Sequence, residues 1–409
     1  MTLRPDIKCD FQLLSRTVHG QPIVFLDSAA SSQKPRAVLA AMDDYYETTH
    51  ANVHRGAYEI AAHATERMES ARRRIARFIG APTENEVIFT KNATEALNLV
   101  ARSWGGANLG PGDSVLVTEM EHHANIVPWQ MLSAEKGFEI RWLPITADGQ
   151  LDLSELDRHL DGVKMVACTA MSNVVGTLNP IARIADAAHQ AGALITVDAS
   201  QYVPHLPTDV QAMGADFLAF TGHKMCGPTG IGVLWGRSEL LDAMPPFLGG
   251  GEMILDVRKD GFTPNVLPHK FEAGTPPIAE IVGLGAAVDY LSELGMEAVR
   301  EHEVSLTAYA MRTLTERYGE DITIHGPAEP ASRGGVLSIA FRDVHPHDIS
   351  QVLDQHAVCV RAGHHCAKPL MRVLGVPASA RASFYVYNDE SDVDKLADAL
   401  QEAGDLFAV

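Results

Sequence analysis

One lysine of the sequence stands where a charged side chain would be costly. Lys224 lies in FTGHKMCGPTGIGVLW, a stretch that is apolar and bounded by glycines. Because an unpaired ammonium group is expensive to bury, burial lowers the pKa of a lysine and favours its neutral form. A neutral amine is a nucleophile that can condense with an aldehyde. A solvated loop lysine is the alternative interpretation, and this stretch by itself is compatible with both.

Cys366 is the second residue of the sequence that could do covalent chemistry. It lies in VRAGHHCAKP, where Arg361, His364 and His365 supply an electropositive setting for a thiolate, the reactive form of cysteine. Three adjacent side chains point in different directions, so the sequence predicts no metal site at the two histidines and the cysteine. A plain structural cysteine is the alternative. No function is assigned to the remaining cysteines, which are Cys9, Cys168, Cys226 and Cys359.

Polar residues that follow strand-like runs could bind an aromatic aldehyde. Asp198 ends the run ALITVD, and a carboxylate there can pair with a protonated pyridine nitrogen, although Asp at a strand end is also a common helix cap. Gln201, three residues later, could reach a phenolic oxygen on the same ring. His122 and His123 follow SVLVTEM, and an imidazole could stack on the ring and act as an acid or base near neutral pH. Only one of these adjacent histidines is expected in a site.

Thr94 is a candidate phosphate ligand. The run FTKNATEALNLV passes from a strand into a helix at Ala93 and Thr94, and the free amides and positive dipole end of a helix suit a phosphate. The Thr94 hydroxyl would add a hydrogen-bond donor. The alternative is a capping threonine, with Glu95 complementing the helix dipole.

Short apolar runs alternate with amphipathic segments between about residue 85 and residue 240. The predicted strands are EVIFT (86–90), SVLVTEM (114–120), KMVACTAM (164–171) and ALITVDAS (193–200), and the predicted helices are 93–103, 153–160 and 180–191. This alternation favours an α/β fold with a mostly parallel central sheet wrapped by helices. In such sheets ligands gather at the carboxyl ends of the strands, where the candidate residues are expected.

The sequence changes character after about residue 244. Residues 244–277 are rich in glycine and proline, which is typical of loops that shape a site or an interface. A helical pattern begins at about residue 278 and leads to the strand-like runs GVLSIAF (335–341) and AVCVRAG (357–363), which predict a smaller α+β domain. We therefore predict a large cofactor-binding domain at 21–285 and a small domain that combines 1–20 with 286–409 and carries Cys366.

The charge of the chain disfavours some classes of partner. The formal net charge is -19 over 409 residues, so nucleic acid and an anionic membrane surface would be repelled. Charges interrupt every apolar stretch near the N-terminus, and no apolar run approaches membrane-spanning length. The sequence therefore predicts no nucleic-acid partner, no membrane partner and a cytoplasmic location.

Together these segments resemble the SufS-type (group II) cysteine desulfurases, which are fold-type I pyridoxal phosphate (PLP) enzymes. The similarity runs nearly from end to end, through FLDSAASSQKP, NVHRG, NATEALNLVA, EHHANIVPWQ, SNVVGT, VDASQ, TGHKMCGPTGIG, FEAGTPP, VRAGHHCA and RASFYVYN. It implies the fold-type I PLP-transferase fold with PLP as the cofactor. A selenocysteine lyase or cysteine sulfinate desulfinase is the alternative within PLP chemistry, and a non-catalytic docking platform is the alternative outside it.

The resemblance implies a role for each matching position. Lys224 would bind the PLP aldehyde covalently, Asp198 would meet its pyridine nitrogen, Gln201 its phenolic oxygen, and His122 would stack over the ring. The phosphate ligands would be Thr94, Thr221, His223 and, reaching the neighbouring subunit of a homodimer, Thr275. The substrate ligands would be Asn173, which also borders the cofactor, together with Arg361, Arg381 and, from the dimer partner, His54 and Arg55.

The resemblance also implies the reaction. L-cysteine would give L-alanine, and its sulfur would remain as a persulfide on Cys366 for iron–sulfur cluster assembly. The short RAGHHCAKP segment implies that a dedicated acceptor protein docks at the site. The segment DVHPHDIS resembles the subgroup that uses a zinc-containing SufU-type acceptor rather than a SufE-type one, and His347 would engage the zinc. A solvated loop histidine is the alternative for His347.

Overall fold

A mostly parallel sheet forms the centre of the larger part of the chain. The computed structural model describes residues 3–407, and within them the sheet has seven strands. Their spatial order is β4 (Val87–Thr90), β10 (Gly232–Gly236), β9 (Phe217–Thr221), β8 (Leu194–Asp198), β7 (Val163–Thr169), β5 (Ser114–Thr118) and β6 (Glu139–Leu143). Only β10 runs antiparallel to its neighbours within this described sheet. The predicted α/β fold is confirmed.

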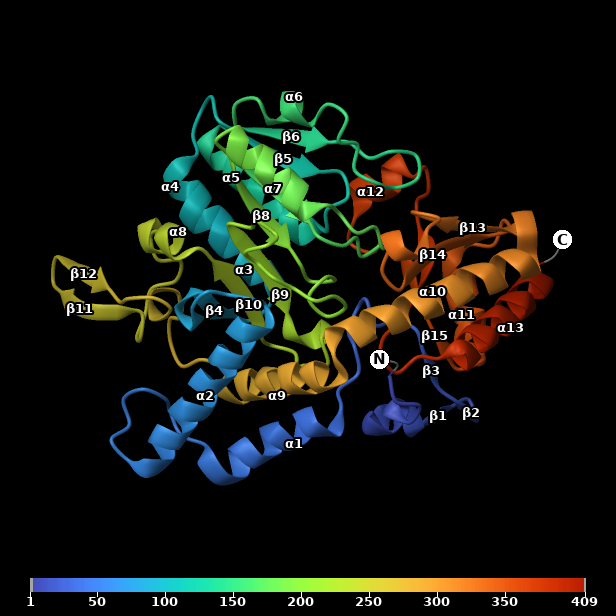
Figure 1. Ribbon diagram of the computed structural model, residues 1–409, viewed down its shortest axis with the longest axis horizontal. Coiled ribbons are helices and arrows are strands. Elements are labelled where there is room, and N and C mark those ends of the chain that lie inside the picture. Colours follow the sequence, from blue (N-terminus) through green and yellow to red (C-terminus); the bar gives the residue numbers. More distant parts are fainter. Residues whose placement is uncertain (1–2, 408–409) are drawn as a thin grey trace.

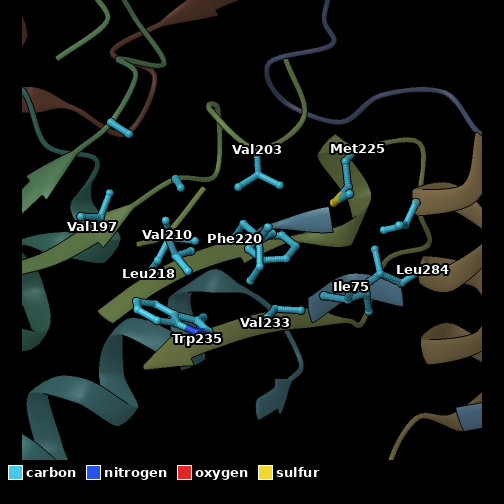
Figure 2. Packing of buried hydrophobic residues seen from close by; sticks show 14 of the residues in the cluster. Ile75, Val197, Val203, Val210, Leu218, Phe220, Met225, Val233, Trp235 and Leu284 are labelled. Atoms are coloured by element: carbon cyan, nitrogen blue, oxygen red, sulfur yellow. The ribbon is translucent and has the colours of Figure 1, made fainter. Parts of the chain in front are cut away.

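Helices cover both faces of this sheet because successive strand residues are apolar on both sides (Figure 1). In β9, Leu218 and Phe220 pack into one core and Phe217 and Ala219 into the other, which is the alternation expected of a doubly covered strand. The helices of the first core are α2 (Glu59–Phe78), α7 (Ile181–Gln190) and α9 (Ile278–Leu294). Those of the second are α3 (Ala93–Leu99), α5 (Val127–Lys136) and α8 (Ser238–Ala243). Figure 2 shows Leu218 and Phe220 within the first core.

A second unit follows α9 and has its own core. Gly295, with a φ of 80°, ends α9 and allows the chain to start α10 (Met296–Tyr318), which extends toward this unit in Figure 1. The antiparallel sheet of this unit has the order β13 (Ile322–His325), β14 (Val336–Phe341), β17 (Ser379–Ser383) and β16 (Arg361–Gly363). It packs against α10, α11 (Pro346–Gln355) and α13 (Glu390–Leu406). The smaller α+β unit expected from the sequence is confirmed.

The run 357–363 differs from the single strand that was expected. The chain forms β15 (Val358–Cys359), which pairs in parallel with β3 (Val24–Phe25), and then β16, which pairs with β17. The run is therefore shared between two sheets, because an N-terminal segment packs into the second core. The division at 21–285 against 1–20 with 286–409 stays a prediction.

Several shorter elements complete the described chain. The loop-like region 244–277 contains an antiparallel hairpin of β11 (Ile254–Arg258) and β12 (Gly261–Pro264), which projects away from the second unit in Figure 1. The remaining elements include α1 (Arg36–Asp44), α4 (Gly106–Asn108), α6 (Leu156–Leu160), α12 (Lys368–Val373), β1 (Thr17–Val18) and β2 (Gln21–Pro22). None of the helices between residues 3 and 407 has the length and apolar character needed to cross a lipid bilayer.

A buried ion pair joins α2 and β4 to the segment that precedes Thr275. Arg72 is fully buried, and its two terminal nitrogens donate to the Glu272 carboxylate oxygens at 2.7 and 2.9 Å. The same arginine donates to the carbonyl of Val87 at 2.7 Å, and Glu272 accepts from the amide of Phe89 at 2.7 Å. The pair thus fixes the beginning of the FEAGTPP loop to the sheet.

Replacing Arg72 by methionine is expected to lower the free energy of unfolding by about 3–5 kcal/mol, because the Glu272 carboxylate would remain buried without its cation. Urea unfolding followed by circular dichroism measures the change. Arg73→Met is the matched control: Arg73 pairs with the exposed Glu66, so its loss should cost less than about 1 kcal/mol. Equal small losses for both variants would contradict this account of the pair.

Candidate functional site

A cavity of about 260 Å³ lies at the carboxyl ends of the parallel strands, where the second unit meets the sheet. Its walls come from the turns after β4, β5, β7, β8 and β9 and from β16, β17 and the segment after β16. The predicted site residues that line it are Thr94, His122, Asn173, Asp198, Gln201, Thr221, His223, Lys224, Arg361, Cys366 and Arg381. Residues from both units therefore meet at the strand ends, as the sequence predicted.

Four predicted site residues lie outside this cavity. Thr275 is exposed in the loop after Glu272. His54 Nε2 lies 4.0 Å from Glu69, and Arg55 pairs with Glu252 at 3.2 Å. His347 is exposed at the start of α11, where its ring stacks on that of His345 with centroids 5.4 Å apart. A role in the site of a partner subunit or in docking therefore stays a prediction for these residues.

Lys224 ends a short 3-10 turn, Gly222–Lys224, that follows β9. Burial lowers the pKa of its amine to about 8. The negative charge of the nearby Asp198 carboxylate raises the pKa and so offsets part of this effect. Asp198 ends β8 and is held by Ser200, whose amide and hydroxyl donate to Oδ1 at 3.0 and 2.6 Å. The glycines around the lysine allow close packing, since a Cβ on Gly232 would lie 2.4 Å from the backbone of Asn92. Lys224 is half-buried and lines the cavity, which favours the reactive amine over a solvated loop lysine.

His122 and His123 have different surroundings and different hydrogen-bond partners. His122 Nδ1 accepts the amide hydrogen of Ala124 at 3.1 Å, so the neutral ring carries its proton on Nε2. Burial, helped by the positive charge of Lys224, lowers the pKa of His122 to about 4. His123 instead donates its amide to the Cys366 carbonyl at 2.7 Å and accepts the Lys368 amide on Nε2 at 3.0 Å. Only His122 of this pair lines the described cavity, as expected.

The segment that carries Cys366 is strained and held in place. His365 and Cys366 have φ angles of 51° and 56°, a region that side chains with a Cβ seldom adopt. Asn173 Nδ2 donates to the His365 carbonyl at 2.8 Å, and the Cys366 amide donates to His364 Nδ1 at 3.1 Å. Together with the bond from His123, these contacts fix the backbone while the cysteine remains exposed. The reactive-cysteine interpretation is therefore favoured over a buried structural one.

Thr94 does not cap the helix that begins beside it. The side chain of Asn92 caps α3 by accepting the Glu95 amide at 2.9 Å, which leaves Thr94 in the first turn and on the cavity wall. Gln201 is buried in the same cavity; its Nε2 donates to the Ala29 carbonyl at 2.7 Å, and its Oε1 has no hydrogen-bond partner in the described chain. Polar groups thus remain available to a ligand in this part of the cavity.

Two acidic residues of the site were missed from the sequence. Glu121 is buried directly before His122 and accepts hydrogen bonds from the Thr118 hydroxyl, the Asn125 amide side chain and the Thr169 backbone amide, at 2.7, 2.6 and 2.7 Å. Three donors favour the carboxylate, although burial raises its pKa to about 8. Glu121 thus fixes the turn that carries His122. Asp27 contacts Arg361 and Arg381. Both acids lie inside motifs already noted, in EHHAN and FLDSAA, which was the available signal.

Comparisons with known proteins agree with this geometry. Residues 24–396 match the Aminotransferase class-V family. A probable cysteine desulfurase of Streptomyces coelicolor is 52% identical over 407 residues, covering 98% of this chain and 97% of that protein. The apo structure of a cysteine desulfurase from Thermococcus onnurineus superposes with a TM-score of 0.93 at 37% identity, covering 98% of both chains. The structure of the Escherichia coli cysteine desulfurase CsdA in an S-sulfonic acid form gives 0.91 at 38% identity, with 98% of both chains covered.

Proposed function

Because the chain belongs to the aminotransferase class-V family, we propose that it is a cysteine desulfurase that converts L-cysteine to L-alanine and provides sulfur for iron–sulfur cluster assembly. The observation that carries the proposal is one cavity that holds both a half-buried lysine of lowered pKa and an exposed cysteine. The similarity to cysteine desulfurases over the whole chain supports it. The exposed Cys366 favours desulfuration over a selenocysteine lyase or sulfinate desulfinase, which need a sulfur acceptor less.

PLP is the cofactor of this class, and the cavity residues fit its groups. Lys224 offers an amine to the aldehyde, and Asp198 offers a carboxylate to the ring nitrogen. Gln201 retains a second hydrogen on Nε2 for the phenolic oxygen, and the wall at Thr94 and Thr221 presents hydroxyl groups for the phosphate. His122 and His223 would complete the pocket as ring and phosphate neighbours. When bound, PLP supplies an electron sink for the negative charge left by removal of the substrate's Cα proton.

Residues of the chain itself would bind the substrate, transfer the protons and accept the sulfur. Arg381 and Asn173 orient the substrate carboxylate, and the neutral amine of Lys224 accepts the Cα proton. Cys366 then attacks the substrate sulfur, forming an S–S bond while the Cβ–S bond breaks. The electron pair of the broken bond stays on Cβ, which takes up a proton in place of the one lost from the Cys366 thiol. Lys224 returns its proton to Cα, alanine leaves, and Cys366 retains the sulfur as a persulfide.

The test is incubation of the PLP-loaded protein with L-cysteine and a reductant that discharges the persulfide. We expect alanine and sulfide in equal amounts, with alanine quantified by chromatography and sulfide by a colorimetric assay. Protein that has bound PLP but forms neither product would contradict the proposal. Protein that binds no PLP would favour the non-catalytic docking platform.

Covalent capture of PLP by the cofactor-free protein is expected to depend on pH with a midpoint near 8. Below that pH the Lys224 amine is protonated and unreactive, and above it the rate levels off. Stopped-flow absorbance measures the rate. In Asp198→Asn the midpoint should fall further, because Asp198 is the carboxylate that raises this pKa. A midpoint near 10.5, the ordinary lysine value, would show that Lys224 is solvated.

The persulfide is proposed to pass to a dedicated acceptor, as in the SufS-type branch. The Cys366 segment is short and anchored at His123, Asn173 and His364, so its sulfur does not travel far. The resemblance of the segment DVHPHDIS favours a zinc-containing SufU-type acceptor over a SufE-type one, and His347 in that segment is exposed and so accessible to a partner. His347→Ala should then abolish stimulation of turnover by such an acceptor. Undiminished stimulation would contradict this part of the proposal.

A homodimer is also part of the proposal, with a cytoplasmic location. Thr275, His54 and Arg55 lie outside their own subunit's cavity, and the nearby hairpin exposes apolar side chains such as Val257 and Phe262. If a second copy of the chain covered this region, Thr275, His54 and Arg55 of one subunit would lie at the cavity of the other subunit. Light scattering at micromolar concentration should give twice the chain mass of 44.2 kDa. A monomer that is fully active would contradict the dimer.

A further inference from the structure

Asp27 bridges two arginines behind the wall of the cavity. Its Oδ1 accepts from Arg361 Nε at 3.1 Å and from a terminal nitrogen of Arg381 at 3.3 Å, and its Oδ2 accepts from Arg361 at 2.9 Å. Asp27 follows β3, which ties the N-terminal segment to the second unit, and it is mostly buried, with 18% of its side chain exposed. It is therefore built into the frame of the site rather than attached to its surface.

The two arginines face the cavity as a pair, whereas Asp27 does not. Arg361 and Arg381 stand directly opposite each other in the register of β16 and β17, and both line the cavity. Arg381 is 2% exposed, and one further nitrogen donates to the Asn173 carbonyl at 2.9 Å. Its Nε is buried with no partner in the described chain. Two cations and one carboxylate leave one net positive charge at this wall.

We propose that Asp27 is a specificity-determining residue. By limiting this wall to one net positive charge, Asp27 makes the site prefer an amino-acid substrate with a single acid group. The inference rests on the proposed function, because it concerns which substrate that same site prefers. L-cysteine carries one carboxylate and a thiol, whereas L-cysteine sulfinate carries a second, permanently charged acid group. A wall of charge two would attract the dianion more than the monoanion, since Coulomb energies inside a partly buried site are weakly screened.

The test compares Asp27→Asn with the wild type on both substrates. The ratio of kcat/KM for L-cysteine sulfinate to kcat/KM for L-cysteine, from alanine formation, should rise by about tenfold or more. Arg361→Gln removes a cation instead, so the same ratio should fall below the wild-type value. Because Arg361 is half exposed, this second variant keeps the test open if Asp27→Asn does not fold. Asp354→Asn is the matched control: it makes the same charge change at an exposed carboxylate paired with His19 and should leave the ratio unchanged.

A binding measurement separates this inference from the proposed function. Calorimetry on the cofactor-free protein would compare 3-mercaptopropionate, with one acid group, and 3-sulfinopropionate, with two. Asp27→Asn should tighten binding of the dianion relative to the monoanion by about tenfold, even if the wild type turns over neither amino acid. An unchanged preference in folded Asp27→Asn would overturn the inference, as would an equal shift in Asp354→Asn or a rising ratio in Arg361→Gln.

Discussion

Lys224→Ala is expected to lower alanine formation from L-cysteine by at least about a thousandfold, because it removes both the covalent link to the cofactor and the base at Cα. Borohydride reduction followed by peptide mapping should find the reduced cofactor on Lys224 in the wild type and on no lysine in the variant. Lys224 lines the cavity, and burial lowers the pKa of its amine to about 8. A substantial fraction of the Lys224 amine is therefore neutral and reactive near pH 8.

Lys34 provides the matched comparison for this labelling. Burial also lowers the pKa of Lys34 to about 8, so a low pKa alone would make it equally reactive. Its amine is, however, occupied by the Ser32 and His223 carbonyls and the Ser31 hydroxyl, and it does not line the cavity. We therefore expect no label on Lys34. A reduced cofactor on Lys34 in the wild type would show that position in the cavity does not decide reactivity.

Cys366→Ser is expected to reduce sulfur release from L-cysteine by about a thousandfold or more while the PLP absorbance is retained, since a hydroxyl does not replace a thiolate as sulfur acceptor. Turnover of L-selenocysteine should survive in this variant, because selenium leaves without a protein nucleophile. Cys9→Ser removes the other exposed cysteine, which does not line the cavity, and should leave sulfur release unchanged. Equal loss on both substrates in Cys366→Ser would indicate a structural role for Cys366.

The sequence was sufficient for the parts of the fold with strong local signals. The β-branched runs at 86–90, 114–120, 164–171 and 193–200 became β4, β5, β7 and β8 because such residues suit strands buried on both faces. The strands β9 and β10 were not predicted, because both are short and border a glycine-rich stretch that is typical of a loop. The run 357–363 was divided by pairing with a segment some 330 residues earlier, which no local pattern encodes.

In the site, too, residues with a local sequence signal were predicted, whereas residues whose role depends on long-range contacts were not. Residues that end predicted strands, such as Asp198 and His122, met at one cavity because parallel strands present their carboxyl ends together. Asp27 and Glu121 were missed, because the importance of a carboxylate that contacts other side chains depends on long-range packing. Motifs contained both residues, but only the contacts to Arg361, Arg381 and Thr169 distinguish them from ordinary acidic residues.

The most direct test of the account is the mass of the Cys366 peptide after the PLP-loaded protein has been mixed with L-cysteine, alkylated and digested without reductant. We expect a peptide that is heavier by one sulfur atom, formed together with one equivalent of alanine. Alanine release with an unmodified Cys366, or sulfur found on another cysteine instead, would contradict it.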